Sequence, residues 1–248
     1  MPETFLETST GRRLAYNLSE GSGPGVVFLG GFASDKAGSK ALFLEDYCRK
    51  RGRAYLRFDY SGHGTSSGAF TDGAIGDWAE DAYAALSALT QGPQVIVGSS
   101  MGGWISLLLA KRCPERFAGL VTIAAAPDFT EDSMWSWMDD AQKTQLLEEG
   151  AVELPSDYGA PYTITRRLIE EARDHLVLRT QLSLPMPVRM LQGSADTDVD
   201  QSVALRLLAH VAGDNIRLEI VKGADHRFSE PPLLALIAAK IEEVLADG

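Results

Sequence analysis

The chain has 248 residues, of which 45% are hydrophobic and 23% are charged, an ordinary composition for a folded globular protein. A chain of this length buries roughly 70% or more of the surface that its unfolded form exposes, so a core needs neither disulfides nor a structural metal. The 23 Lys and Arg against 34 Asp and Glu give a formal net charge of −11, and no basic cluster stands out. Nucleic acid and anionic membrane surfaces are therefore poor partners.

The sequence shows no sign of a membrane or export segment. No run approaches the roughly 18 apolar residues that a membrane-spanning helix needs, and residues 1–13 lack the apolar stretch of a secretory signal. We therefore expect one soluble, cytoplasmic domain over residues 1–248. Cys48 and Cys113 have no short spacing to other ligand types, so we expect ordinary core or surface cysteines.

The opening residues predict a β-hairpin, and the rest of the chain alternates between strands and helices. Residues 4–8 and 13–18 flank a Ser-Thr-Gly turn, and the apolar run at 26–29 has the pattern of a buried strand. Alternation of this kind favours an α/β fold with a mostly parallel eight-stranded sheet, helices on both faces and the hairpin as an antiparallel edge. Further strands are expected at 54–58, 94–98, 119–125, 188–192 and 217–221, and helices at 40–51, 75–89, 104–111, 202–211 and 231–245.

The stretch between residues 126 and 188 interrupts this alternation. It holds about 60 residues without a convincing strand, far more than the roughly 2–6 residues of an ordinary α/β connection. We interpret residues 128–184 as a helical cap inserted over the sheet. Its first half fits either an amphipathic lid or a helix packed on the core. In this first half Lys143 is the one basic residue, and the acidic residues are Asp128, Glu131, Asp132, Asp139, Asp140, Glu148, Glu149, Glu153 and Asp157. The large apolar residues of the same half are Met134, Trp135, Trp137, Met138, Leu146 and Leu147.

The motif Gly98-Ser-Ser-Met-Gly102 matches G-x-S-x-G, with a predicted strand before it and a predicted helix after it. This context is typical of a nucleophile elbow, a sharp turn that exposes a serine hydroxyl above the sheet. Glycines are needed two positions either side of the serine because Cβ atoms there would collide with neighbouring backbone. Ser100 is the predicted nucleophile, and a tight glycine turn without chemistry is the alternative.

A serine hydroxyl needs a base, usually a histidine oriented by a carboxylate. Among the four histidines, His226 directly follows the last predicted strand. It is therefore expected at the carboxyl edge of the sheet, where α/β proteins bind ligands, and we assign it as the base. His175 and His210 fall within helical patterns, and His63 lies in a loop after an early strand that it is expected to order.

The carboxylate should also follow a strand, and Asp196 comes directly after the strand predicted at 188–192. The order Ser100, Asp196, His226 is then that of nucleophile, acid and base in α/β-hydrolases. We therefore assign Asp196 as the acid. The rivals near strand ends are Asp128, Asp198 and Asp225, the last being too close in sequence to His226 to orient its ring.

Two backbone N–H groups are expected to stabilise the oxyanion. The N–H of Met101 opens the helix after the nucleophile, and the N–H of Phe32 follows Gly30-Gly31 at the end of the first parallel strand. Removal of one such donor typically costs about 3–4 kcal/mol of transition-state stabilisation. The side chains of Phe32 and Met101 either line an acyl pocket or pack against the cap.

These motifs resemble the α/β-hydrolase superfamily over nearly the whole chain. More narrowly, the chain resembles the family of mitochondrial palmitoyl-protein thioesterases, also called mycophenolic acid acyl-glucuronide esterases. The narrower resemblance rests on Lys40-Ala-Leu, Phe58-Asp-Tyr-Ser-Gly, Gly92-Pro-Gln, Val97-Gly-Ser-Ser-Met-Gly-Gly-Trp and Asp225-His-Arg. It implies the α/β-hydrolase fold, a catalytic triad at Ser100, Asp196 and His226, and hydrolysis of acyl thioesters or esters, including fatty acyl groups on protein cysteines, without a cofactor. The mitochondrial location is not carried over, because the chain lacks an Arg-rich transit segment.

The leading hypothesis is a serine esterase or thioesterase that acts on a small acyl ester or thioester, or on an acylated protein, through an acyl-enzyme. One alternative is a ligand-binding receptor without turnover, because fold alone does not dictate function. Others are carbon–carbon bond hydrolysis and perhydrolysis, which use the same three residues. No pair of His or Cys residues has metal-ligand spacing, so no metal is expected.

Overall fold

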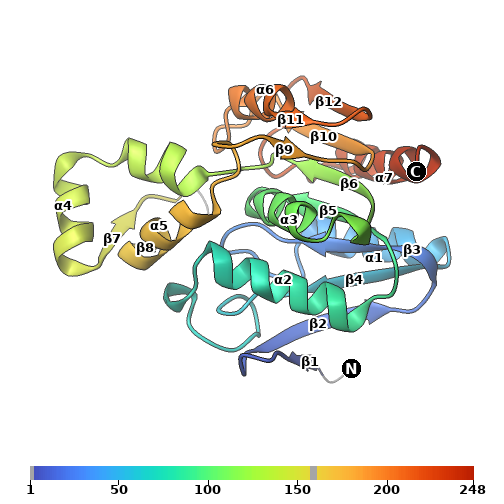
Figure 1. Cartoon of the computed structure of the whole chain (residues 1–248), viewed down its shortest axis with the longest axis horizontal. Coiled ribbons are helices and arrows are strands. Elements are labelled where there is room, and N and C mark those ends of the chain that lie inside the picture. The colour runs from blue at the N-terminus through green and yellow to red at the C-terminus, as the bar shows by residue number, and fades with distance from the viewer. Residues whose placement is uncertain (1–2, 157–160) are drawn as a thin grey trace.

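The computed structural model describes residues 3–156 and 161–248, and its centre is an eight-stranded sheet (Figure 1). The strands of this sheet are β1 Thr4–Glu7, β2 Arg13–Ser19, β3 Ser22–Leu29, β4 Arg53–Phe58, β5 Gln94–Ser99, β6 Phe117–Ile123, β10 Val188–Gly193 and β12 Ile216–Val221. They lie in the order β1-β2-β4-β3-β5-β6-β10-β12. The pairs β1–β2 and β2–β4 are antiparallel, and all other neighbouring pairs are parallel. The predicted α/β sheet with an antiparallel edge is confirmed.

Helices cover both faces of the sheet, because the inner strands are apolar on both sides. Their bounds are α1 Ser39–Lys50, α2 Ile75–Leu89, α3 Met101–Arg112, α6 Gln201–His210 and α7 Pro231–Ala246. Successive strand residues point to opposite faces. Val26 and Phe28 accordingly belong to one apolar cluster with α1 and α7, whereas Val27 and Leu29 belong to another with α2, α3 and α6. Both cysteines, Cys48 and Cys113, are buried and free.

The parallel strands all end at the same edge of the sheet, which brings distant parts of the chain together. The loop with Phe32 follows β3, Ser100 follows β5, Asp196 follows β10 and His226 follows β12. These four strands are near neighbours in the sheet, in the order β3-β5-β6-β10-β12, with β6 as the one other strand among them. The candidate site residues therefore lie together at the carboxyl edge of the sheet, where α/β proteins bind ligands.

Two elements of the core begin well before their predicted starts: β3 begins at Ser22, four residues before residue 26, and α3 is the other. The helix begins at Met101, three residues before the predicted start at Trp104. Its first turn contains Gly102 and Gly103, which are poor helix formers, and it is buried almost all round. A helix without a polar face has little amphipathic periodicity, so its start could not be located from hydrophobic spacing.

The cap contains more than helices. It comprises a π-helical turn at Thr130–Trp135, α4 Asp140–Glu149, β7 Ala151–Leu154, β8 Tyr162–Thr165, α5 Arg166–Ala172 and a 3-10 turn at Arg173–His175. The strands β7 and β8 form an antiparallel pair at the outer end of the molecule (Figure 1), so the prediction of a segment without strands was wrong. Each has only four residues, the shortest length at which period-two alternation indicates a strand, so the pattern was easily overlooked within the long insertion. The predicted acidic residue Asp157 lies outside the described residues.

The apolar residues of the cap divide between inside and outside. Met138 and Leu146 are buried, whereas Trp137 is 72% exposed and Leu147 is also exposed. Other short secondary elements complete the fold: 3-10 turns at Phe70–Asp72 and Pro114–Arg116, and a small parallel pair that joins β9 Leu182–Ser183, at the end of the cap, to β11 Val211–Ala212.

The buried Trp78 of α2 provides a test of how this core is packed. Its side chain is fully buried, and its indole N–H donates to the carbonyl of Ser61 at 3.1 Å. We expect Trp78→Ala to lower the free energy of unfolding by about 3–5 kcal/mol, because it leaves a large cavity in the core. Exposed Trp137 is the matched control, and Trp137→Ala should change stability by less than about 0.5 kcal/mol. Urea unfolding measures both, and equal losses would contradict this packing.

Candidate active site

Ser100 occupies the sharp turn between β5 and α3. Its backbone has φ 53° and ψ −118°, a strained conformation for a residue other than glycine. Backbone hydrogen bonds hold it there: its N–H donates to the carbonyl of Ile123 at 2.9 Å, and its carbonyl accepts from the N–H of Ala126 at 3.1 Å. The turn is therefore fastened to the loop that leaves β6.

Two glycines allow the backbone to pass through this turn. A Cβ atom on Gly98 would lie 2.4 Å from the carbonyl oxygen of Gly102, and one on Gly102 would lie 2.1 Å from the carbonyl oxygen of Leu29. Backbone atoms cannot move aside as a side-chain tip can, so neither position accepts a larger residue without distortion. This is the crowding that the G-x-S-x-G pattern predicts.

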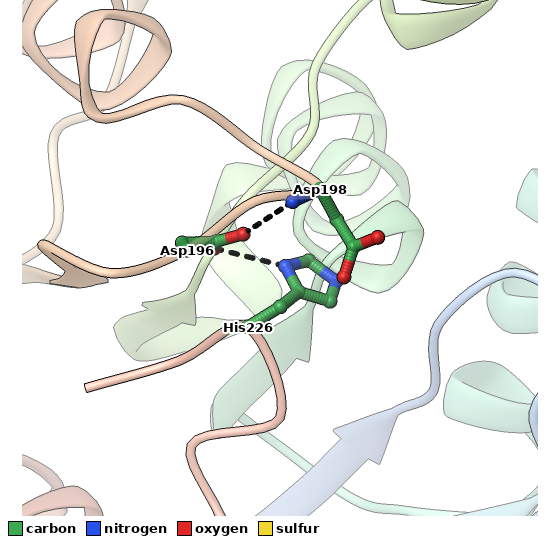
Figure 2. Close-up of side chains that lie close together, drawn as sticks. All are labelled: Asp196, Asp198 and His226. Carbon is green, nitrogen blue, oxygen red and sulfur yellow. Dashed lines mark hydrogen bonds and ion pairs between the residues drawn. The ribbon is translucent and has the colours of Figure 1, made fainter. Parts of the chain in front are cut away.

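His226 and Asp196 are hydrogen bonded to each other. The Nδ1 atom of His226 lies 2.9 Å from Oδ2 of Asp196 (Figure 2). The Asp196 side chain is fully buried, and that of His226 is 16% exposed. With the proton of a neutral ring on Nδ1, the lone pair is on Nε2, which is the state a general base requires.

Asp196 is surrounded by hydrogen-bond donors. Its Oδ1 accepts the N–H groups of Asp198 at 2.9 Å and Val199 at 2.8 Å, and its Oδ2 also accepts the side-chain amide of Gln192 at 2.9 Å. Burial alone would raise the pKa of Asp196, but the hydrogen bond from His226 and the N–H groups of Val199 and Asp198 outweigh it, so the pKa is lowered. The carboxylate is held ionised beside the histidine.

The other histidines take part in structural contacts away from this pair. His63 is buried among aromatic rings, with Nδ1 3.1 Å from the carbonyl of Ser61. His175 pairs with Glu171, and Nε2 of His210 lies 2.7 Å from the carbonyl of Thr180. Of the four histidines, all described, His226 is the one that the structure joins to Asp196.

Asp128, one of the alternatives to Asp196 as the acid, makes contacts within the cap instead. It is fully buried, accepts the N–H groups of Val177 and Leu178 at 2.8 and 3.0 Å, and pairs with Arg179 at 3.2 Å. It therefore fastens the two ends of the cap to each other. Asp225 accepts the N–H of Phe228 at 3.0 Å and so shapes its own loop.

The two predicted oxyanion donors lie near the serine. Gly31, next to Phe32, approaches so closely that a Cβ there would meet the Cβ of Ser100 at 3.4 Å, and Met101 follows Ser100 directly. Within residues 3–156 and 161–248, neither the N–H of Phe32 nor that of Met101 donates to another backbone or side-chain group.

The side chains of these two residues differ. The Phe32 ring lines the cavity described below and makes edge contacts with Phe129 and Tyr162 of the cap, with ring centroids 5.6 and 5.4 Å apart. Phe32 thus both lines the pocket and packs against the cap. The Met101 side chain is fully buried in the core and does not line the cavity.

A cavity of about 970 Å³ opens over Ser100 and His226. Beneath the cap its wall is mainly apolar, although Asp132, Ser133 and Gln142 also line it. Toward α1, α6 and the loop of His226 the wall is polar and charged. The apolar part is lined by Phe32, Met134, Trp137, Met138, Leu154 and Tyr162, and the polar part by Asp35, Lys40, Asp198, Arg206 and Arg227.

The cluster of Asp196, Asp198 and His226 also needs comparison with a metal site, because one ligand atom from each lies within 4.8 Å of the others. Both oxygens of Asp196 already accept two hydrogen bonds, and one of these comes from Nδ1 of His226. Apart from Asp196, the cluster offers only Asp198 and one ring nitrogen as ligands, fewer than the three or four protein ligands of zinc sites. The arrangement fits a carboxylate-oriented histidine better than a metal centre.

The family model described as alpha/beta hydrolase fold matches residues 24–184 of this chain. The chain therefore belongs to the α/β-hydrolase family. It is 33% identical to the mitochondrial palmitoyl-protein thioesterase ABHD10 of Rattus norvegicus over 98% of this chain and 82% of that protein. The human protein of the same name is 31% identical over 98% of this chain and 79% of its own length. This agrees with the family that the sequence motifs resemble.

Solved structures agree with these relatives. A putative hydrolase from Agrobacterium vitis S4 superposes with a TM-score of 0.93 at 36% identity, covering 99% of this chain and all of that one. Mouse alpha/beta hydrolase domain-containing protein 10 gives 0.92 at 31% identity, covering 100% and 99%. Est1E of Butyrivibrio proteoclasticus, at 17% identity and 0.80 over 98% of both chains, shares the fold. In the part of the chain that the structure describes, no helix is long and apolar enough to cross a membrane.

Sequence reasoning overlooked Gln192 as part of the site. Its amide donates both to Asp196 and to the carbonyl of Val199 at 2.9 Å, so it holds the acid loop against the end of β10. A signal was present: Gln192 is a polar residue in a strand otherwise expected to be buried on both faces. The second overlooked feature is the place of Asp198 beside His226 (Figure 2).

The lowered pKa of Asp196 gives a pH dependence of stability. A carboxylate whose pKa is lower in the folded chain stabilises the fold above its ordinary pKa of 3.8, and that contribution is lost as the pH falls through the folded value. We therefore expect wild type to exceed Asp196→Asn in free energy of unfolding by more at about pH 6 than at about pH 3. Urea unfolding at both values measures this. Exposed Asp214 supplies the control Asp214→Asn, and a constant Asp196→Asn difference across the range would contradict the coupling.

Proposed function

We propose that the protein is a serine hydrolase that cleaves acyl thioesters or carboxylic esters through an acyl-enzyme on Ser100. The observation that carries the proposal is the hydrogen-bonded Asp196–His226 pair at the wall of the cavity that also exposes the strained Ser100. Family membership and relatedness to a named thioesterase support the same chemistry. The roles of nucleophile, base and acid then fall to Ser100, His226 and Asp196.

In the first half of the reaction, Nε2 of His226 takes the proton of Ser100 as the hydroxyl oxygen attacks the acyl carbon. The negative oxygen of the tetrahedral intermediate is held by the N–H groups of Phe32 and Met101. The intermediate then breaks the bond to the leaving group, which receives the proton from His226. Asp196 stabilises the charged ring but keeps its own negative charge throughout.

In the second half, water replaces the leaving group. Its oxygen attacks the acyl carbon while Nε2 of His226 accepts a proton, and the second intermediate releases Ser100 with that proton returned to the hydroxyl. The product is a free carboxylic acid. No cofactor enters either half.

The shape of the cavity suggests where the two parts of a substrate lie. The acyl group fits against Met134, Met138 and Tyr162 beneath the cap, where apolar burial stabilises it by about 0.8 kcal/mol for each methylene. The leaving group then faces the charged wall with Lys40 and Arg227. Because the relatives are named palmitoyl-protein thioesterases, the first substrate to test is a protein that carries a long acyl chain on a cysteine. We keep the cytoplasm as the expected location.

Substitution of Ser100 tests the proposal directly. We expect Ser100→Ala to lower kcat for p-nitrophenyl esters and acyl thioesters by more than about 1,000-fold, because the nucleophile is lost, with the melting temperature nearly unchanged. A fluorophosphonate probe should label wild type and fail to label this variant. Exposed Ser136, on the cap, provides the control Ser136→Ala, which should keep both activity and labelling. Full activity of Ser100→Ala would end the proposal, and a folded wild type that resists the probe would favour a receptor.

The acyl site is tested by filling its apolar end. We expect wild type to prefer palmitoyl over acetyl thioesters in kcat/KM, and Met134→Trp to lower the palmitoyl-to-acetyl ratio by about tenfold, because the larger ring occupies space for the chain end. Trp135 is the control, since its ring contacts Lys143 and Arg173 rather than the cavity. Trp135→Ala should therefore leave the ratio unchanged. A preference of the wild type for acetyl would contradict this assignment of the cavity.

A further inference from the structure

Asp198 is an acid at the candidate active site for which the mechanism above has no use. Its side chain lines the cavity together with Ser100 and His226. One of its carboxylate oxygens, a ring nitrogen of His226 and an oxygen of Asp196 all lie within 4.8 Å of one another. In Figure 2 the Asp198 carboxylate lies beside the edge of the ring opposite Asp196, where Nε2 is found.

The loop after β10 fixes this position. Oδ1 of Asp196 accepts the N–H of Asp198 at 2.9 Å and that of Val199 at 2.8 Å, which curls the backbone around the acid. Val199 is buried, and its carbonyl accepts the amide of Gln192. The same carboxylate that orients the ring from one side therefore also orients the backbone that carries Asp198 to the other side.

The spacing of Asp198 and His226 suits a water molecule between them. A water that donates to a carboxylate at about 2.7 Å and to a ring nitrogen at about 2.8 Å spans about 4.5 Å between the two. An Asp198 oxygen and a ring nitrogen of His226 lie at most 4.8 Å apart, an upper limit that leaves room for this span. Nδ1 is bonded to Asp196, and the Asp198 carboxylate lies beside the opposite edge of the ring (Figure 2), so Nε2 is the nitrogen left to accept from such a water. A water has two O–H groups, and this site offers one acceptor for each.

We propose that Asp198 is a further catalytic residue, which holds the hydrolytic water on His226 while the acyl-enzyme is broken down. The inference rests on the proposed function and adds one group to its second half. One O–H of the water points to Nε2 and the other to the Asp198 carboxylate, which leaves an oxygen lone pair for the acyl carbon on Ser100. As the carbon–oxygen bond to water forms, the first proton moves to Nε2, while the second stays on the new acid group. The bond to the Ser100 oxygen then breaks, and that oxygen recovers the proton from Nε2.

The proposal separates the two halves of the reaction. Formation of the acyl-enzyme needs Ser100, His226 and the oxyanion donors but no water, so it does not depend on Asp198. Phosphonylation of Ser100 by a fluorophosphonate likewise needs no water, because fluoride simply leaves. Hydrolysis alone needs a molecule with two O–H groups in a fixed orientation.

The experiment compares Asp198→Ala with wild type in rapid-mixing kinetics with a p-nitrophenyl ester. We expect deacylation to slow by about 10- to 100-fold, the usual effect of one hydrogen bond to a charged group, so that a burst appears and intact mass shows acylated Ser100. Fluorophosphonate labelling should proceed at the wild-type rate. Asp198→Asn, whose amide oxygen still accepts a hydrogen bond, should restore part of the lost rate.

Methanol supplies a readout that a purely structural role would not move. It has one O–H, which points to Nε2, so Asp198 cannot assist its attack. In Asp198→Ala the ratio of methyl ester to acid formed from one acyl-enzyme should therefore rise about as much as hydrolysis falls. Asp200, on the same loop, caps α6 by accepting the N–H of Ser202 at 2.8 Å. Asp200→Asn removes one charge nearby and should leave the ratio unchanged.

The outcomes distinguish this inference from the proposed function. If Asp198→Ala keeps the wild-type ratio of methyl ester to acid, or slows phosphonylation as much as hydrolysis, Asp198 does not position the water and this inference is overturned. If Ser100→Ala remains active, the proposed function itself fails. A melting temperature of Asp198→Ala near that of wild type shows that the comparison is made on folded protein.

Discussion

The close approach of helix α3 to strand β3 is the constraint on which the rest of the site depends. At Gly102 the helix passes so near the carbonyl of Leu29 that no Cβ fits between them. The chain therefore turns within one residue, and Ser100 takes a conformation that costs about 1–3 kcal/mol in isolation. Backbone hydrogen bonds to Ile123 and from Ala126 hold it there. The same contact brings the start of α3 beside the loop that leaves β3, so that Gly31, the neighbour of Phe32, lies against Ser100.

A second constraint is the buried carboxylate of Asp196. Four donors meet its two oxygens: one ring nitrogen, one side-chain amide and two backbone N–H groups. Each donor fixes a different piece of the surroundings, because a buried acceptor that lost a partner would remain unsatisfied. The ring of His226, the end of β10 and the curl of the following loop are thus set by one group. Such shared hydrogen bonding makes the site stiffer than a pair of exposed side chains.

The sequence predicted the sheet, most helices and the candidate Ser100, Asp196 and His226 because these depend on local rules. Strand runs, a glycine-framed serine and the carboxyl-edge rule are all readable from short stretches. The start of α3 was not predicted, since burial on all sides removed its periodicity, and the β7–β8 pair was too short to be recognised. Gln192 was missed because its contacts with Asp196 and Val199 depend on how the loop after β10 curls, which a strand pattern does not show. Asp198 was considered only as a rival acid, because its place beside His226 depends on β10 and β12 being neighbours in the sheet.

The division of the cavity between sheet and cap explains how reaction and selectivity can vary separately. The groups assigned to the chemistry lie at ends of β3, β5, β10 and β12, whose order is fixed by parallel pairing and by the glycine contacts. The apolar wall comes mainly from the cap, which contacts the core through the ring of Phe32 and whose two ends are held together by the buried Asp128. A change at Met134 or Met138 therefore alters the space for an acyl chain without touching the strained turn. Because the Phe32 ring contacts Phe129 and Tyr162 of the cap while its N–H is assigned to the oxyanion, the width of the acyl site and the position of one oxyanion donor are linked at this residue.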